Sequence, residues 1–327
     1  MDDPLYYIGI DVAKHKFDVA VKLPNGKYKH KVFCNHHQGF DEFICWLNAF
    51  DGRFCAVMEA TNIYHEALAD CLVAQNIMVS IINPKCSASF AKSDNLRSKT
   101  DKIDAKLLAD YACEKGHKLV CYQPMLPAQR QLLRKSRQLD HLKDKLAQEK
   151  VRLSMLIDED CIAYTKAMID FIKGQIKALQ QSIRQCVASD DTLKQNVSLL
   201  LSIPAIGFDS AVKLICYLGD GSRFKNAKAA AAFAGLTPMI KSSGSSLHQV
   251  MGISKIGQAD IRKALYCPAM NFAFGRYKDG AYRLFVDRLN SQGKAKKVVI
   301  TALMRKLVSI AQAVLQTQTP FKLELHR

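Results

Sequence analysis

Short apolar runs alternate with segments of helical periodicity over the first 115 residues of the chain. Residues 17–23 alternate apolar and polar positions, and a Pro-Asn-Gly-Lys turn at 24–27 separates them from the next run. Apolar residues recur at helical spacing over 40–50, and an Asn-Pro pair at 83–84 ends the last apolar run. The pattern predicts strands at 6–10, 17–23, 28–33, 54–58 and 79–82, and helices at 40–50 and 67–73.

This order of elements, three strands followed by alternating helices and strands, is that of a ribonuclease-H-like sheet. Other α/β domains share the order, so it is weak evidence when taken alone. In a ribonuclease-H-like sheet the first and fourth strands lie side by side. We therefore expect the ends of those two strands to lie close together.

Residues 128–188 contain almost no glycine and repeat leucine and isoleucine at steps of three, four and seven. The acidic stretch 158–160 divides the repeat into two heptad seams, which predict an antiparallel helical hairpin or an intermolecular coiled coil. A spacer arm is the simplest role for this segment, although its charged face also suits nucleic acid. The seam residues are Leu132, Leu139, Leu142, Leu146, Leu153 and Leu156, followed by Ile169, Ile172, Ile176, Leu179, Ile183 and Cys186.

The last region, from about residue 191 to 327, is predicted to be mostly helical with Gly-rich breaks. The segment 203–207, Ile-Pro-Ala-Ile-Gly, joins two apolar helical stretches and is similar to the turn of a helix-hairpin-helix. In such a turn, backbone N–H groups at a helix start hold a phosphate. Ala205 stands where these turns usually have glycine, so phosphate binding and a plain connection both remain open.

Composition and charge then point to a class of partner. The 327 residues are 49% hydrophobic and 24% charged, which excludes a mainly disordered chain. The net charge is +17, and residues 251–327 alone contain 14 Lys and Arg against 4 Asp and Glu. A polyanion relieves such self-repulsion, so nucleic acid is the favoured partner over an incidentally basic enzyme.

The 11 cysteines are scattered and form no CxxC pair, which suits a reducing cytosol rather than a zinc or disulfide framework. The first residues show no secretory signal pattern, and the most apolar stretch, 197–206, is about half the length that spans a bilayer. We expect a soluble cytoplasmic protein that is not in a membrane.

Four acidic residues occupy positions that suit metal ligands. Asp11 and Glu59 each end a predicted strand, and Asp101 and Asp104 lie three residues apart on one helix face. Each has an ordinary explanation as well, since acids cap helices and favour the first turn. Four neighbouring carboxylates would raise one another's pKa, and a divalent cation such as Mg²⁺ would relieve that cost.

A serine-rich stretch follows at 242–246, Ser-Ser-Gly-Ser-Ser, with Lys241, Lys255, Arg262 and Lys263 close in sequence. Its composition is typical of a flexible loop. A serine beside phosphate-binding cations is also a candidate nucleophile, provided that its deprotonation is assisted. His248 is near, but no His-Asp pairing is evident.

Nine ordered motifs connect the whole chain with one family. The sequence resembles the transposases of insertion-sequence family 110, also called bridge-RNA-guided recombinases. The motifs are YIGIDVAK (7–14), EAT (59–61), INP (82–84), KTDKIDA (99–105), SIPAIG (202–207), FAGLTP (233–238), SGSS (243–246), SKIG (254–257) and RKALY (262–266).

The resemblance implies three domains: a RuvC-like catalytic domain (1–125), a coiled-coil arm (126–190) and a C-terminal transposase domain (191–327). It places the family's Asp-Glu-Asp-Asp set on Asp11, Glu59, Asp101 and Asp104, and its serine nucleophile on Ser243. Ser242 is an additional adjacent hydroxyl.

The resemblance also implies donor and target double-stranded DNA, a structured noncoding bridge RNA, Mg²⁺ and a tetramer built as a dimer of dimers. Base pairing with the RNA would then choose the DNA sites, while Arg97, Lys99, Lys241, Lys255, Arg262 and Lys263 are candidate nucleic-acid contacts. Two alternatives remain: a metal-dependent junction-resolving nuclease without a covalent intermediate, and a noncatalytic RNA-binding scaffold.

Overall fold

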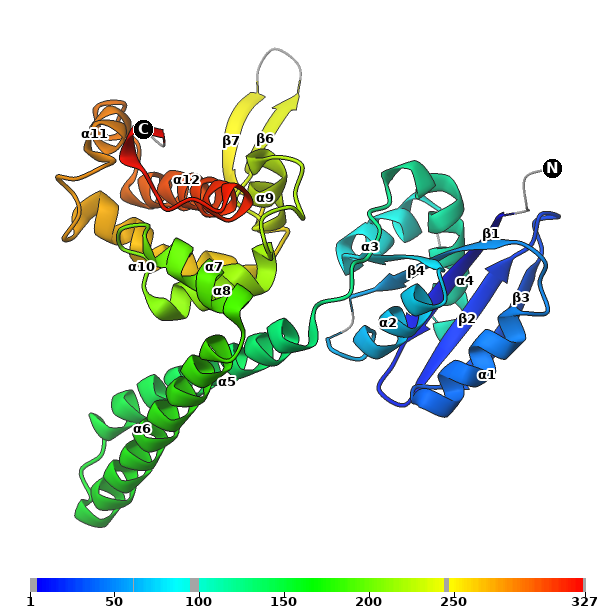
Figure 1. Ribbon diagram of the computed structural model, residues 1–327, viewed down its shortest axis with the longest axis horizontal. Coiled ribbons are helices and arrows are strands. Elements are labelled where there is room, and N and C mark those ends of the chain that lie inside the picture. Colours follow the sequence, from blue (N-terminus) through cyan, green and yellow to red (C-terminus); the bar gives the residue numbers. More distant parts are fainter. Residues whose placement is uncertain (1–4, 61, 95–99, 244–246, 326–327) are drawn as a thin grey trace. The chain divides into compact units, whose positions relative to one another are not determined.

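The computed structural model describes residues 5–60, 62–94, 100–243 and 247–325, and for 240–243, 247–251 and 325 the backbone alone. The chain divides into two compact units, residues 1–125 and 126–327. Figure 1 shows strands and short helices in the first unit, and long helices with one β-hairpin in the second. The mixed α/β N-terminal region and the mostly helical remainder confirm those parts of the expected fold. The division of residues 126–327 into an arm and a transposase domain stays a prediction.

A five-stranded sheet forms the centre of the first unit, with strand order β3-β2-β1-β4-β5. Its strands are β1 (Leu5–Val12), β2 (Lys16–Lys22), β3 (Tyr28–Cys34), β4 (Arg53–Glu59) and β5 (Met78–Ile82). β1 pairs with β2 in antiparallel and with β4 in parallel orientation, with Ile10 opposite Met58. The first and fourth strands are therefore neighbours, as the sequence predicted.

Helices cover both faces of this sheet. One face packs on α1 (His37–Leu47) and α2 (Glu66–Ala74) through a core that includes Ile8, Ile10 and Phe17. The other face carries α4 (Asp101–Lys115), which follows α3 (Pro84–Ser93) and leads into a short 3₁₀ turn, η1 (Gly116–Lys118). Because side chains alternate along a strand, Asp11 lies on the face of β1 opposite Ile8 and Ile10, the same face as Gly9 and α4.

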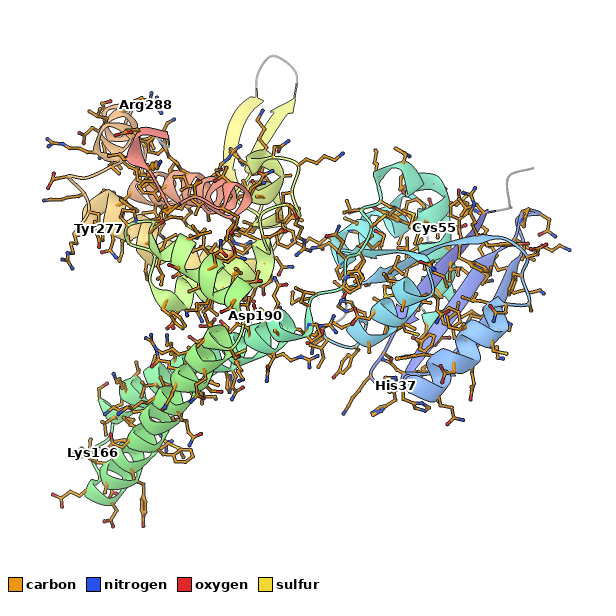
Figure 2. The ribbon with its side chains drawn as sticks, in the orientation of Figure 1. His37, Cys55, Lys166, Asp190, Tyr277 and Arg288 are labelled. Carbon is orange, nitrogen blue, oxygen red and sulfur yellow. The ribbon has the colours of Figure 1, made fainter. Side chains whose placement is uncertain are left out.

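The helices α5 (Pro127–Leu153) and α6 (Glu159–Ala188) pack along each other in the second unit. Lys135 donates to the hydroxyl of Ser182 at 2.9 Å, so the beginning of α5 lies beside the end of α6 and the pair is antiparallel. The side chain of Asp158 accepts from the amide of Cys161 at 2.9 Å and caps α6 where the acidic break was found. Figure 2 labels Lys166 in α6 and Asp190, whose side chain caps the next helix.

The rest of the second unit consists of helices and one hairpin, which projects beside α9 in Figure 1. Its elements are α7 (Asp191–Leu201), α8 (Phe208–Leu218), α9 (Ala227–Phe233), β6 (Pro238–Ser243), β7 (Leu247–Ile253), α10 (Ala259–Phe274), α11 (Arg283–Ser291), α12 (Lys296–Thr317) and η2 (Leu323–Leu325). The hairpin of β6 and β7 was not predicted, because its Ser- and Gly-rich tip has the composition of a loop. Between α7 and α8, Ala205 has φ +64°, the conformation that glycine favours.

One described helix, α12, is long and apolar enough to span a membrane by length and composition. Within its most apolar window 61% of the residues are buried inside the protein. Leu303, Leu307 and Val308 in this helix are fully covered. α12 is thus a core helix of the second unit.

Candidate active site

Asp11 is the residue around which the acidic side chains gather. It is the penultimate residue of β1 and is half-buried. Burial, and after it the charges of Asp104, Asp101, Glu59 and Asp18, together raise its pKa from 3.8 to about 6. A carboxyl group with such a pKa is poised to bind either a proton or a cation near neutral pH.

Glu59 ends β4, the parallel neighbour of β1. The hydroxyl of the buried Ser87 in α3 donates a short hydrogen bond to its carboxylate. Asn83 caps α3 by accepting from the amide of Lys85 at 2.9 Å, and this cap sets where Ser87 lies along the helix. Glu59 is therefore held by a partner outside the acidic set.

Asp101 and Asp104 lie in the first turn of α4, whose N-cap is Thr100. The Thr100 hydroxyl accepts from the amide of Ile103 at 3.3 Å, so the capping interpretation of this motif is confirmed. Gly9 lets the turn approach the sheet, since a Cβ there would lie 1.9 Å from the carbonyl oxygen of Ala105. The close packing of α4 on β1 brings the acidic turn to Asp11.

Lys16, the first residue of β2, lies among these acids. Its ammonium is 2.7 Å from Asp101 and 3.1 Å from Asp18. Asp18 is 4% exposed, although it stands in an otherwise apolar strand, and His30 contacts its other oxygen at 3.0 Å. The ion pair lowers the pKa of Asp101.

The donor set suits a hard divalent cation, because all four side chains offer carboxylate oxygens and Asp11 is destabilised by their charges. Within the described ranges, however, no group of three or more His, Cys, Asp or Glu side chains has an arrangement that holds a metal ion. Asp101 contacts Lys16, and Glu59 accepts a hydrogen bond from Ser87.

Ser243 is the last residue of β6, where its backbone pairs with Leu247 of β7. Residues 244–246 of the same motif lie outside the described residues, and so do Arg97 and Lys99. Lys241 precedes Ser243 by two positions in the same strand. The structure thus presents the candidate nucleophile on a hairpin of the second unit, whereas the acidic residues belong to the first.

The other candidate cations have different surroundings. Arg262 donates to the backbone carbonyls of Ala234 at 2.9 Å and Gly257 at 3.2 Å, so its guanidinium braces the segment after β7 against α9. Lys263 pairs with Asp144 of α5 at 2.9 Å. Lys255 is exposed and has φ +53°.

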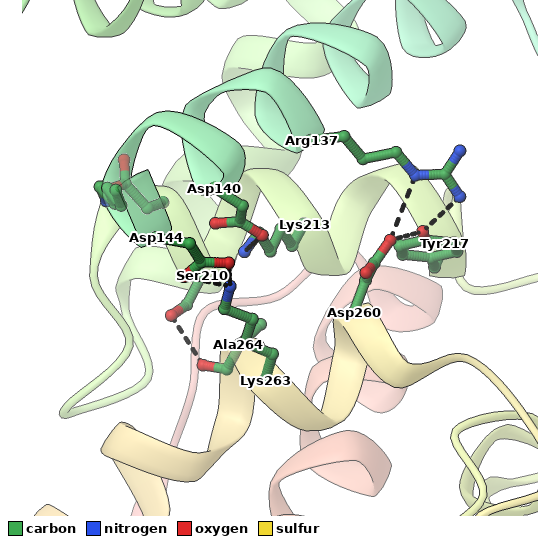
Figure 3. Close-up of polar contacts among 11 residues, drawn as sticks. Arg137, Asp140, Asp144, Ser210, Lys213, Tyr217, Asp260, Lys263 and Ala264 are labelled. Atoms are coloured by element: carbon green, nitrogen blue, oxygen red, sulfur yellow. Dashed lines mark hydrogen bonds and ion pairs between the residues drawn. The ribbon is translucent and has the colours of Figure 1, made fainter. Parts of the chain in front are cut away.

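A network of charged groups fixes α5 on α8 and α10, as Figure 3 shows. Arg137 of α5 contacts Asp260 at 3.2 Å and donates to the hydroxyl of Tyr217 at 3.0 Å, while that hydroxyl donates a short bond to Asp260. Lys213 of α8 is 6% exposed and makes a short ion pair with Asp140. These contacts give the middle of α5 a defined position on α8 and α10.

Two family models and several relatives match this chain. A DEDD transposase model of the IS110 type matches residues 8–161, and a second model, described as the transposase IS116/IS110/IS902 family, matches residues 197–283. Proteins named pilin gene-inverting protein, from Moraxella lacunata and Moraxella bovis, are each 37% identical over 326 residues, 98% of both chains.

The chain belongs to the IS110 family of transposases. A transposase for insertion sequence element IS1328 from Yersinia enterocolitica is a more distant relative, 31% identical over 152 residues, which is 46% of this chain and 44% of the relative. The IS110 transposase described here is accordingly an enzyme that recombines DNA, and the name of the DEDD model indicates a divalent metal cofactor.

Sequence reasoning missed three side chains at the acidic site of this IS110 transposase: Lys16, Asp18 and Ser87. Asp18 gave a signal, since it is an acidic residue inside an apolar strand pattern. Lys16 and Ser87 gave none, because their partners lie 85 and 28 positions away in the chain.

Proposed function

We propose that this transposase exchanges DNA strands through a covalent phosphoserine at Ser243, with Mg²⁺ bound by Asp11, Glu59, Asp101 and Asp104. The observation that carries the proposal is the electrostatic state of Asp11, whose pKa is raised to about 6 by burial and by the other three carboxylates. Structural carboxylates are normally arranged to avoid such mutual repulsion, whereas metal sites accept it.

The sheet supports a RuvC-like assignment of the first unit. The order β3-β2-β1-β4-β5, with β1 parallel to β4 and antiparallel to β2, is the order expected of a ribonuclease-H-like domain. Asp11 and Glu59 end neighbouring strands of this sheet. A bound divalent cation would polarise the scissile phosphate there and lower the cost of deprotonating the serine.

Strand exchange through a phosphoserine of the second unit needs no external energy source. The Ser243 oxygen attacks phosphorus, the bond to the leaving DNA oxygen breaks, and that oxygen takes up a proton as a free hydroxyl. A hydroxyl of the other duplex then attacks the phosphoserine and releases Ser243. The phosphodiester energy is kept in the covalent link, so strand exchange proceeds without ATP.

The two halves of this site lie on different units of one chain. We therefore assign α5 and α6 the role of a coiled-coil arm through which subunits meet, so that the acids of one subunit serve the serine of another in a tetramer built of dimers. The antiparallel pairing of the two helices and the predicted heptads support the arm.

A structured noncoding RNA is the proposed guide, pairing with donor and target DNA. The net charge of +17, of which +10 lies in residues 251–327, supports a protein that neutralises several nucleic-acid backbones and leaves sequence choice to base pairing. Such a protein would act in the cytoplasm, at the nucleoid.

A second candidate reaction is inversion of a DNA segment in place. It is favoured by one observation: the Moraxella relatives that match 98% of this chain carry the name pilin gene-inverting protein. Inversion and transposition use the same strand exchange and differ in how the two DNA sites are arranged. A plasmid with the two sites in inverted orientation distinguishes them.

The proposal is tested with purified protein, its flanking noncoding RNA and DNA carrying both sites. The wild type should give a denaturant-stable protein–DNA adduct, and Ser243→Ala should abolish the adduct while RNA binding persists; Ser242→Ala is the matched control and should retain it. Adducts that persist in Ser243→Ala contradict the assignment. Metal-dependent cleavage with no adduct in any form would indicate the junction-resolving nuclease. RNA binding that is the sole activity and survives EDTA would indicate the scaffold.

A further inference from the structure

Lys16 links two parts of the first unit that carry different acids. Its ammonium lies 3.1 Å from Asp18 on its own strand and 2.7 Å from Asp101 in the first turn of α4. The side chain of Lys16 is 47% exposed and that of Asp101 is 54% exposed. An ion pair so exposed to solvent is weak and readily exchanged.

Asp18 gives the same ammonium a fixed anchor. Its side chain is 6% exposed, and His30 holds its second oxygen at 3.0 Å. Asp18 is also the cross-strand partner of Asp11 in the pairing of β1 with β2. Opposed residues of an antiparallel pair project to the same face of the sheet, so the anchor lies beside the acidic site.

We propose that Lys16 is the resident counter-ion of the acidic site: it holds Asp101 while no divalent cation is bound and, kept in place by Asp18, releases Asp101 when a cation arrives. This inference rests on the metal site of the proposed function. It assigns to Lys16 a positioning role, because the ammonium acts through Asp101 and Asp18.

Two observations support exchange over a purely structural bridge. Lys16 donates to a carboxylate oxygen of Asp101 at 2.7 Å, and a bound cation would need that same carboxylate. Within the described residues no three His, Cys, Asp or Glu side chains are arranged to hold a metal ion, and in this same arrangement Asp101 contacts Lys16 and Glu59 accepts from Ser87. A single positive charge beside several carboxylates also lowers their repulsion in the cation-free protein.

The same strand contains a natural control. Lys22, the last residue of β2, also bridges to α4, where it contacts Asp110 at 2.7 Å. Both lysines thus connect β2 with α4 by an ion pair of the same length, but Asp110 is not one of the four acids. Lys22→Met removes a Lys–Asp bridge between the same two elements without touching the acidic site, and Asp110 keeps its hydrogen bond from the Tyr28 hydroxyl.

The test is isothermal titration of the full-length protein with Mn²⁺, without nucleic acid. Lys16→Met should bind Mn²⁺ roughly three- to tenfold more tightly than the wild type, because the competing ammonium and its repulsion of a nearby dication are both removed. Lys16→Arg should bind like the wild type, since the charge is retained, and so should Lys22→Met. In an Asp101→Asn background, Lys16→Met should have a smaller effect.

Tryptophan fluorescence of Trp46, in α1, verifies that each variant has a folded first unit. Unchanged or weaker Mn²⁺ binding by folded Lys16→Met overturns the counter-ion role and leaves the metal site standing. If Lys16→Met does not fold, the Mn²⁺ affinity of Lys16→Arg still tests the proposal, because tighter binding by Lys16→Arg contradicts it. Absence of Mn²⁺ binding in every form overturns the metal site and this inference together.

Discussion

Gly9 provides a sharp test of how the fold positions the acidic turn. It lies in β1 beneath α4, where a Cβ would be 1.9 Å from the carbonyl oxygen of Ala105 and 2.3 Å from the amide nitrogen of Ala109. Both neighbours are helix backbone and have no rotamer with which to avoid the clash. Since ordinary contacts are about 3.5 Å, Gly9→Ala must displace α4 by roughly 1.5 Å.

The cost of Gly9→Ala follows from this displacement. Overpacking a well-packed site costs about 1–3 kcal/mol, and a shift of a whole helix belongs at the upper end, so we expect a loss of ~3 kcal/mol in the free energy of unfolding of the first unit. For a unit of this size the melting temperature should fall by roughly 10 °C or more. Asp101 and Asp104 should also move away from Asp11, because they lie in the first turn of the displaced helix.

The assay is urea unfolding followed by Trp46, the one tryptophan of the chain, which packs against Phe33 and Phe50 in the first unit. Gly116→Ala is the control, because Gly116 follows α4 with φ −46° and a Cβ there would meet nothing within 4 Å. It should leave stability unchanged or raise it slightly. A wild-type unfolding midpoint in Gly9→Ala would refute the account of how α4 packs on β1.

Two further predictions concern single charged groups. The raised pKa of Asp11, about 6 against 3.8 in the unfolded chain, means that the native state binds the extra proton between these values, so this group's contribution to stability falls as the pH rises from about 4 to 6. At pH 7.5, Asp11→Asn should therefore be more stable than the wild type by roughly 1–2 kcal/mol, after allowance for partial solvent exposure. In unfolding followed by Trp46 fluorescence, this difference should vanish near pH 4. A larger difference at pH 4 than at pH 7.5 would contradict the predicted direction of the pH dependence. Lys213→Met leaves the Asp140 carboxylate without its buried partner and should destabilise the second unit by about 2–4 kcal/mol in thermal unfolding followed by circular dichroism. The double variant with Asp140→Leu should recover most of this loss. Wild-type stability in the Lys213→Met single variant would show that the ion pair is dispensable.

Much of the first unit could be predicted from its sequence because each strand has a local signal. The apolar runs and the turn at 24–27 placed β1 to β5 within two residues of their observed ends. The seam leucines and isoleucines likewise placed α5 and α6, and the acidic stretch 158–160 forms the cap and first residues of α6. These signals are local, since hydrophobic periodicity and turn-forming residues are properties of a few consecutive positions.

The rest depended on contacts that local patterns do not contain. The β6–β7 hairpin was missed because Ser and Gly at its tip are equally typical of a loop. Sequence spacing suggested Arg262 as a phosphate contact, and only the folded chain shows its guanidinium on the carbonyls of Ala234 and Gly257. The role of Gly9, and the pairing of Lys16 with Asp101, arise from α4 packing on a distant strand.

Mass spectrometry of the trapped adduct tests whether Ser243 forms a covalent link to DNA with help from the acidic site. Protein incubated with guide RNA, divalent cation and site-bearing DNA is denatured, digested with nuclease and protease, and sequenced. We expect a nucleotide remnant on Ser243 that is absent from Asp11→Asn. A remnant on another residue, or completed strand exchange with no modified serine, would contradict it.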